Sequence, residues 1–296
     1  MKELEGLGVA LVTPFTVGRD LDLEALSRLV EHCILGGVDY LVVLGTTGES
    51  ATLDKEEKDQ VVRTVIESNK GRLPLVLGIG GNNTKAVVEE IQDTDLDAFE
   101  AILSVSPYYN KPTQSGIFKH FQALAKVAPK PIVIYNVPSR TGSNVLPETV
   151  LKLGFSCPNI CGVKEASGDL EQIKKILNGK PNNFAVLSGD DFTALDTVLL
   201  GGQGVISVLG QAMPDLLSEM IRSGLKGDAL KARALEASLK QGMDLIFEEG
   251  NPSGIKAMLH RLGICSPEVR LPLVKATVDL QAKIDQYIER LITSNS

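Results

Sequence analysis

The chain alternates between short runs of apolar, β-prone residues and longer segments with helical spacing. Eight strand-like runs stand out, at 8–12, 40–44, 75–79, 101–105, 131–135, 160–163, 184–187 and 204–208. Between them, apolar residues recur at the three- and four-residue spacing of a helix with one buried face, as from Leu23 to Leu35. Strands that alternate with helices predict parallel βα units. Eight such units close a barrel, so the pattern predicts a (β/α)8 TIM barrel of the α/β class.

The alternation ends near residue 225. Beyond it only helical patterns remain, over 228–247, 253–262 and 274–292, and the Gly-Asn-Pro at 250–252 and Leu-Pro at 271–272 separate them. We therefore predict a catalytic barrel over 1–225 and a C-terminal α-helical domain over 226–296, with residues 293–296 frayed.

The chemically unusual segments follow directly after the strand-like runs. They are GTTGES at 45–50, GGNNT at 80–84, SPYYNKP at 106–112, YNVPSRTG at 135–142, SGDD at 188–191 and LGQA at 209–212. The active sites of such barrels lie at the carboxyl ends of the strands. We therefore expect these segments to gather around one site.

A single lysine, Lys164, ends the apolar run at 160–163. Desolvation at the end of a buried strand disfavours the charged form of a lysine and lowers its pKa. A lysine that is neutral part of the time can attack a ketone and form a Schiff base. The alternative is that Lys164 is an exposed lysine paired with its neighbour Glu165.

Charge, apolar runs and the cysteine and histidine content exclude several classes of function. The net charge is -7 without a basic stripe, which argues against nucleic acid or a membrane surface as partner. The N-terminus lacks the features of a signal peptide, and no apolar run approaches the ~20 residues that span a bilayer. The four cysteines and three histidines form no metal-binding pattern. We expect a cytoplasmic protein with reduced cysteines and no metal site.

Four motifs, GTTGES, SPYYNKP, YNVPSRTG and GVKEASGD, together resemble those of one family. This family is the pyruvate-dependent class I aldolases of the dihydrodipicolinate synthase and N-acetylneuraminate lyase superfamily. The resemblance runs from about Gly6 to Leu273 and includes NPSGIKAMLHRLG at 251–263. It implies the same barrel and helical domain. It also implies an enzyme without an external cofactor, in which pyruvate forms a covalent imine with Lys164.

The resemblance implies roles for particular residues. Lys164 corresponds to the Schiff-base lysine, and Tyr135 to the tyrosine that moves protons to and from the imine and positions pyruvate. Thr47 corresponds to the hydroxyl that links two tyrosines in a relay. Tyr109 corresponds to the second tyrosine, which in this family comes from the neighbouring subunit of a dimer. The implied binding residues are Thr46 and Thr47 for the pyruvate carboxylate, Arg140 for the carboxylate of the aldehyde, and Gly189 and Ile206 near the lysine.

These residue types suit the chemistry. Imine formation needs a proton donor for the carbinolamine oxygen and a base for the methyl carbon, and a phenol flanked by hydroxyls can do both. A guanidinium binds a carboxylate through two parallel hydrogen bonds. Taken singly, each residue has a structural alternative: Tyr109 as a loop aromatic, Arg140 as a surface cation, Thr46 and Thr47 as β-prone residues that end a strand.

Within the family, GTTGE, the tyrosine pair at 108–109 and Arg140 favour one reaction. It is the condensation of pyruvate with L-aspartate-4-semialdehyde to 4-hydroxy-tetrahydrodipicolinate, in lysine and diaminopimelate biosynthesis. One alternative is a sister aldolase for polyhydroxylated aldehydes, such as N-acetylneuraminate lyase or a 2-keto-3-deoxy sugar-acid aldolase. Another is a non-catalytic binding barrel, which predicts loss of the lysine or the relay residues; none is missing. The resemblance also implies a homo-oligomer, a tetramer built as a dimer of dimers.

An effector cleft is implied as well, at the dimer interface of lysine-inhibited relatives. Its matching residues here are Ser50, Ala51, Asn82 and Tyr108. Its charges differ, because Lys55 and Lys58 replace histidines or neutral residues and Ala86 replaces a glutamate. We therefore expect lysine to inhibit weakly or not at all. The alternative is that both lysines point into solvent and that Glu89 or Glu90 substitutes for the missing carboxylate.

Overall fold

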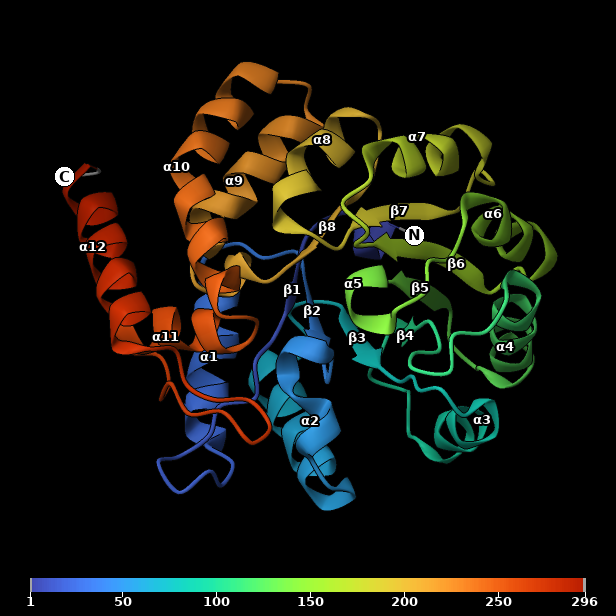
Figure 1. Cartoon of the computed structure of the whole chain (residues 1–296), viewed down its shortest axis with the longest axis horizontal. Coiled ribbons are helices and arrows are strands. Elements are labelled where there is room, and N and C mark those ends of the chain that lie inside the picture. The colour runs from blue at the N-terminus through green and yellow to red at the C-terminus, as the bar shows by residue number, and fades with distance from the viewer. Residues whose placement is uncertain (1, 295–296) are drawn as a thin grey trace.

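A closed barrel of parallel strands forms the centre of the molecule. The computed structural model describes residues 2–294, and over this range eight strands pair in chain order, with β8 closing on β1 (Figure 1). They are β1 (Gly6–Ala10), β2 (Tyr40–Val43), β3 (Leu75–Gly78), β4 (Ala101–Val105), β5 (Ile132–Asn136), β6 (Ile160–Glu165), β7 (Ala185–Ser188) and β8 (Gly204–Ser207). The predicted (β/α)8 barrel is confirmed.

Helices surround the barrel and return the chain from each strand to the next. They are α1 (Leu23–Leu35), α2 (Lys55–Asn69), α3 (Thr84–Asp93), α4 (Gln114–Val127), α5 (Pro138–Thr141), α6 (Pro147–Ser156), α7 (Leu170–Gly179), α8 (Ala194–Leu199) and α9 (Pro214–Leu225). Polar side chains cap several of them; Asp54, for example, forms a capping box with Glu57 at the start of α2. The helices α5 and α8 are too short to show a helical period in the sequence.

The strands bury both faces, as parallel barrel strands do. Alternate residues pack inside the barrel, among them Tyr40, whose ring fills the space that the absent side chain of Gly8 leaves; a Cβ there would lie 2.2 Å from the ring. The other residues face the helices and join the larger core. This alternation sends Tyr135 and Lys164 to the inside of the barrel.

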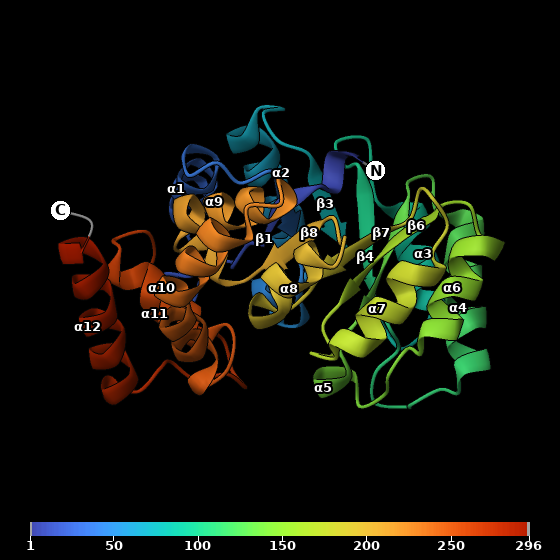
Figure 2. The same cartoon turned by 90° about the horizontal axis from the view of Figure 1, so that it is seen from above.

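The C-terminal helices lie at one end of the molecule (Figure 2). They are α10 (Ala229–Glu248), α11 (Ser253–Arg261) and α12 (Val278–Ser294), and α10 packs on α9. The last helix begins at Val278 rather than at Val274 as predicted, because the Thr277 hydroxyl accepts the amide of Leu280 and caps it. Of the tail predicted to fray, 293–294 belong to α12 and 295–296 lie outside the described residues.

The segment between α11 and α12 runs back along the barrel beside α1 and α2 (Figure 1). It brings residues near position 270 to the loop after β2, and this return matters for the site below. Over residues 2–294, no helix is both long enough and apolar enough to cross a bilayer.

Candidate active site

Lys164 lies near the end of β6 and points into the mouth of the barrel. It is 5% exposed, and its Nζ lies 4.3 Å from the ring centre of Tyr135, its partner on β5. Burial lowers the pKa of Lys164 to about 7; the Asp191 carboxylate opposes this shift and the Arg140 cation adds to it. The amine is therefore partly neutral near pH 7, as a nucleophile must be.

Glu165, the next residue, faces the other way. It is fully buried, and its carboxylate accepts hydrogen bonds from the side chains of Asn136 at 2.9 and 3.0 Å and Gln172 at 2.8 Å, and from the Ser167 amide at 2.8 Å. Neighbouring strand residues point to opposite faces of a sheet. The alternative in which Lys164 is an exposed lysine paired with Glu165 is therefore wrong.

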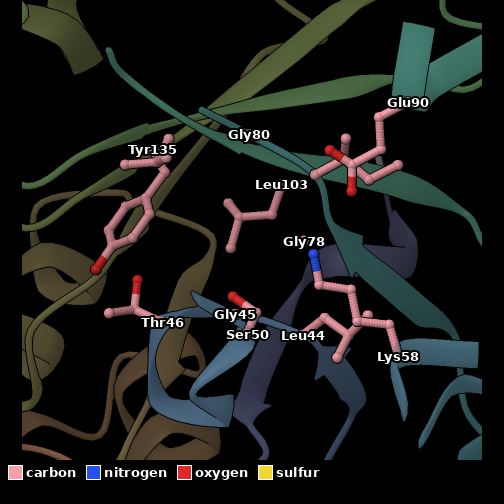
Figure 3. A pocket seen from close by; sticks show the side chains of 12 residues that line it. Leu44, Gly45, Thr46, Ser50, Lys58, Gly78, Gly80, Glu90, Leu103 and Tyr135 are labelled. Atoms are coloured by element: carbon pink, nitrogen blue, oxygen red, sulfur yellow. The ribbon is translucent and has the colours of Figure 1, made fainter. Parts of the chain in front are cut away.

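Tyr135 presents its hydroxyl to the loop after β2. Figure 3 shows this hydroxyl directed toward Thr46. Burial raises the pKa of Tyr135, while the Arg140 cation and a hydrogen bond with Thr46 lower it in part. The phenol is thus protonated at neutral pH and has a hydroxyl beside it through which a proton can move.

The loop after β2 forms two consecutive 3-10 turns, Thr46–Gly48 and Ser50–Thr52. Its Thr47 is buried, and the Thr47 Oγ1 accepts a hydrogen bond of 2.9 Å from the Asn251 side chain. Asn251 belongs to the C-terminal segment and was not among the predicted site residues. In the sequence the Gly-Asn-Pro at 250–252 indicates only a break between helices, and the match of NPSGIK to the family is the one signal that points to Asn251.

A cavity of about 440 Å³ opens over Lys164. The predicted residues that line it are Thr46, Thr47, Tyr135, Arg140, Lys164 and Gly189, and residues not predicted include Ser139, Asp190, Phe192, Phe247 and Asn251. A Cβ at Gly189 would lie 2.9 Å from Cγ of Lys164, so a larger residue would displace the lysine. Ile206 packs with Tyr135 inside the barrel, outside the lining of this cavity.

Arg140 stands at the mouth of the cavity on the short helix α5. The helix runs from Pro138 to Thr141 and is capped by Gly142, whose φ of 73° is in the left-handed region. One Arg140 nitrogen donates to the Asn251 carbonyl at 3.4 Å. The exposed guanidinium retains donors for a ligand carboxylate.

Tyr109 does not reach the cavity of its own chain. It is 88% exposed and has a φ of 71°. Its loop is held by hydrogen bonds from the Asn82 side chain to the Tyr108 carbonyl, at 3.1 Å, and from the Asn110 side chain to the Asn82 carbonyl, at 3.2 Å. Within one chain, the relay from Thr47 to Tyr109 is not assembled.

A smaller pocket of about 100 Å³ lies behind Tyr135 and Thr46 (Figure 3). The Lys58 side chain enters it from α2 and that of Glu90 from α3, and Ser50 also lines it. Lys58 therefore does not point into solvent, whereas Lys55 is exposed.

Three other residues considered for the effector cleft do not line this pocket. Ala51 and Ala86 are exposed, and Glu89 pairs with Lys85 at 3.6 Å. Lys58 and Glu90 also line a larger cavity of about 910 Å³ between α2 and α3. Across residues 2–294, no three histidine, cysteine, aspartate or glutamate side chains converge as a metal site.

The sequence profile of the Dihydrodipicolinate synthetase family matches residues 3–291. The chain belongs to this family. It is 52% identical to the 4-hydroxy-tetrahydrodipicolinate synthase of Flavobacterium psychrophilum, over 98% of this chain and 99% of that one. The resemblance drawn from the motifs is thereby confirmed.

Solved structures of the family have the same fold. Dihydrodipicolinate synthase from Thermotoga maritima superposes with a TM-score of 0.95 at 36% identity, covering 97% of this chain and 98% of that one. A structure described as a monomeric dihydrodipicolinate synthase variant gives a TM-score of 0.94 at 36% identity and covers 96% of both chains. The family therefore includes a monomeric variant.

Proposed function

We propose that this chain is a 4-hydroxy-tetrahydrodipicolinate synthase, which condenses pyruvate with L-aspartate-4-semialdehyde in lysine and diaminopimelate biosynthesis. The observation that carries the proposal is the buried amine of Lys164, with a pKa of about 7, beside Tyr135 in a barrel of this family. We assign catalysis to Lys164, Tyr135, Thr47 and Tyr109, and binding to Thr46, Thr47, Arg140, Gly189 and Ile206.

The first half-reaction is imine formation. The neutral amine of Lys164 attacks the ketone carbon of pyruvate, and Tyr135 donates a proton to the oxygen that leaves as water. The hydroxyls of Thr46 and Thr47, with the amides of their turn, bind the pyruvate carboxylate. The cationic imine withdraws electrons from the methyl group, so the reaction needs no external cofactor.

The second half-reaction forms the carbon–carbon bond. Loss of a proton from the methyl group gives an enamine, whose terminal carbon attacks the aldehyde carbon; the aldehyde oxygen takes up a proton. Arg140 holds the carboxylate of this second substrate at the cavity mouth. The amine of that substrate then displaces Lys164 from the imine carbon, which releases the product and restores the free lysine.

The position of Tyr109 supports a proposal for the assembly. A tyrosine that is 88% exposed on a loop pinned to its own chain is well placed to enter the site of a second copy. We propose a dimer as the minimum active unit, in a tetramer of two such dimers.

We also assign 1–225 to the catalytic barrel, 226–296 to the helical domain, and Ser50, Ala51, Asn82 and Tyr108 to an effector cleft.

Borohydride trapping tests the proposed chemistry directly. Pyruvate and borohydride together should add one reduced pyruvyl group per chain, on the peptide that contains Lys164. The same treatment of Lys164→Ala should add none, and labelling that persists in this variant would contradict the assignment. A coupled assay with pyruvate should then show turnover with aspartate-4-semialdehyde. Faster turnover with polyhydroxylated aldehydes would favour the sister aldolase.

A further inference from the structure

A fully buried ion pair joins the C-terminal segment to the loop after β2. The Lys256 Nζ, from α11, lies 2.5 Å from Oε1 of Glu49, and both side chains have no exposed surface. The remaining polar atoms are also satisfied. Lys256 donates to the Glu268 carbonyl at 2.8 Å, and the second oxygen of Glu49 accepts the Arg270 amide at 2.9 Å. These contacts thus join three parts of the chain: the loop after β2, the helix α11 and the segment around 268–270.

Glu49 occupies a backbone position that few residues other than glycine adopt. Its φ of 52° is left-handed, and it joins the two 3-10 turns of the loop. Its amide closes the first turn onto the Thr46 carbonyl at 3.1 Å, and its own carbonyl accepts the Thr52 amide at 2.9 Å. Glycine or asparagine adopts this conformation at lower cost, so a glutamate here indicates that its side chain is needed.

Aromatic and cationic groups complete the surroundings of the pair. Two cations lie over the Phe15 ring: the Lys256 Nζ is 4.1 Å from the ring centre, and the Arg270 guanidinium carbon is 4.4 Å from it. Arg270 also binds both carboxylate oxygens of Glu57 at 2.6 Å and the Thr52 carbonyl at 3.0 Å. The far end of the loop is therefore anchored to the same segment as Glu49.

The same loop carries Thr46 and Thr47 shortly before Glu49. Both of these threonines line the cavity over Lys164. We propose that Glu49 and Lys256 are positioning residues, which hold Thr46 and Thr47 in place to bind the pyruvate carboxylate. The helical C-terminal segment thereby completes the substrate site of the barrel. This inference rests on the proposed function, because it takes pyruvate as the ligand of the loop.

The test removes the charges while it keeps the volume. Removing one partner of a buried ion pair strongly destabilises the folded protein, because the other charge is left buried and unpaired. Replacing both partners by neutral side chains of similar volume usually changes the stability of the fold much less. The double variant Glu49→Gln with Lys256→Met should therefore fold. The matched control is Glu219→Gln with Lys231→Met, which makes the same replacements in an exposed ion pair between α9 and α10.

The readouts separate positioning from folding. We expect both double variants to melt within a few degrees of the wild type. The Glu49/Lys256 variant should require about tenfold more pyruvate for half-maximal borohydride trapping and for half-maximal rate, while its KM for the aldehyde stays within about twofold. The control should retain wild-type values. Wild-type pyruvate dependence in a folded Glu49/Lys256 variant would overturn the proposal.

A milder variant covers the case in which the double variant does not fold. Glu49→Asp keeps both charges and withdraws the carboxylate by one methylene, so it should fold and weaken trapping by pyruvate severalfold. Unchanged trapping in this variant would also overturn the proposal. If instead wild-type protein shows no pyruvate-dependent trapping, the proposed function fails, and that result is distinct from either of the others.

Discussion

At the scale of single residues, burial sets the chemistry of the site. Lys164 is held in the barrel mouth, and across the described part of the chain no carboxylate lies within ion-pair distance of its Nζ. Desolvation therefore dominates its pKa, and the Asp191 carboxylate offsets it only in part. Arg140, by contrast, is exposed and can present its guanidinium to a ligand.

The pH dependence of imine formation should report this pKa. Only the neutral amine attacks, so the rate of borohydride trapping at fixed pyruvate should rise with pH up to about 7 and level off above it. A lysine of ordinary pKa would instead give a rate that rises about tenfold per pH unit until pH ~10. Stopped-time trapping between pH 5 and pH 10 distinguishes the two, and the continuous rise would contradict a lowered pKa.

Arg140→Ala should separate the two half-reactions. Pyruvate imine formation should persist, because Arg140 stands at the mouth rather than beside the Lys164 amine. Condensation should fall by about a hundredfold or more, since a charge-assisted bidentate contact to the aldehyde's carboxylate is lost. Trapping and coupled rates measure the two steps, with the exposed Arg290→Ala as control. Equal loss of both half-reactions would mean that Arg140 is structural.

At the scale of elements, the pairing of β5 with β6 places the reactive groups. Tyr135 faces Lys164 inside the barrel, and in the same register Asn136 faces Glu165 outside it. The outer pair is tied by hydrogen bonds to Gln172 of α7 and, through Asn136, to Asn144 at 2.7 Å. This outer network holds together the two strand ends that carry the inner pair.

Glu165→Gln should weaken this network. The amide nitrogen of the glutamine would replace one carboxylate oxygen, where it would meet the Asn136 donor together with that of either Gln172 or the Ser167 backbone. We expect a loss of ~1–3 kcal/mol in the free energy of unfolding, measured in urea, together with a lower kcat. The control Glu67→Gln, on the exposed face of α2, should change stability by less than ~0.5 kcal/mol. Equal effects from both variants would contradict the network.

We expect the pocket between helices α2 and α3 to determine whether L-lysine can inhibit the enzyme. Because Lys58 points into the pocket between them, an effector with two ammonium groups would meet a positive charge there. We expect L-lysine below millimolar concentration to leave the initial rate unchanged. Ala86→Glu should increase sensitivity to lysine by about ten- to a hundredfold, as a charge-assisted hydrogen bond would. Clear inhibition of the wild type at sub-millimolar lysine would show that Glu90 already provides the carboxylate.

At the scale of the whole molecule, the barrel site has one contribution from the C-terminal segment, and we propose a second from another copy of the chain. The segment after α10 returns to the loop at 45–50 through Asn251 and Lys256, and a second copy is expected to supply Tyr109. The first contribution is present within the chain. The second requires assembly.

Subunit mixing tests this second contribution. Lys164→Ala and Tyr109→Phe should each be inactive alone. After exchange, a mixed dimer holds one site with both wild-type residues, so random mixing should restore about a quarter of the wild-type activity. The coupled assay measures the recovery, and mass spectrometry under native conditions verifies the exchange and the oligomeric state. No recovery despite exchange, or full activity in a monomer, would contradict a shared site.

The sequence alone determined the order of the elements and the chemical identity of the site. Continuous apolar runs and the 3.6-residue helical period both reflect local burial, so the eight strands and most helices could be predicted from them. The rule that barrel sites lie at the carboxyl ends of the strands then grouped Tyr135, Arg140 and Lys164. The short helices α5 and α8 and the start of α12 could not be located in this way, because a single turn or a cap leaves too few residues for a period.

Only the tertiary structure decided which distant residues support the site. Asn251 on Thr47, Lys256 on Glu49 and Arg270 on Glu57 join positions about two hundred residues apart. The periodicity of apolar residues cannot predict such contacts, because they depend on how the C-terminal helices pack against the barrel. In the sequence, Lys256 has no feature that distinguishes it from other helical lysines, and Glu49 is only part of the GTTGES motif. Only in the folded structure do the two side chains lie together, buried away from water, and form an ion pair.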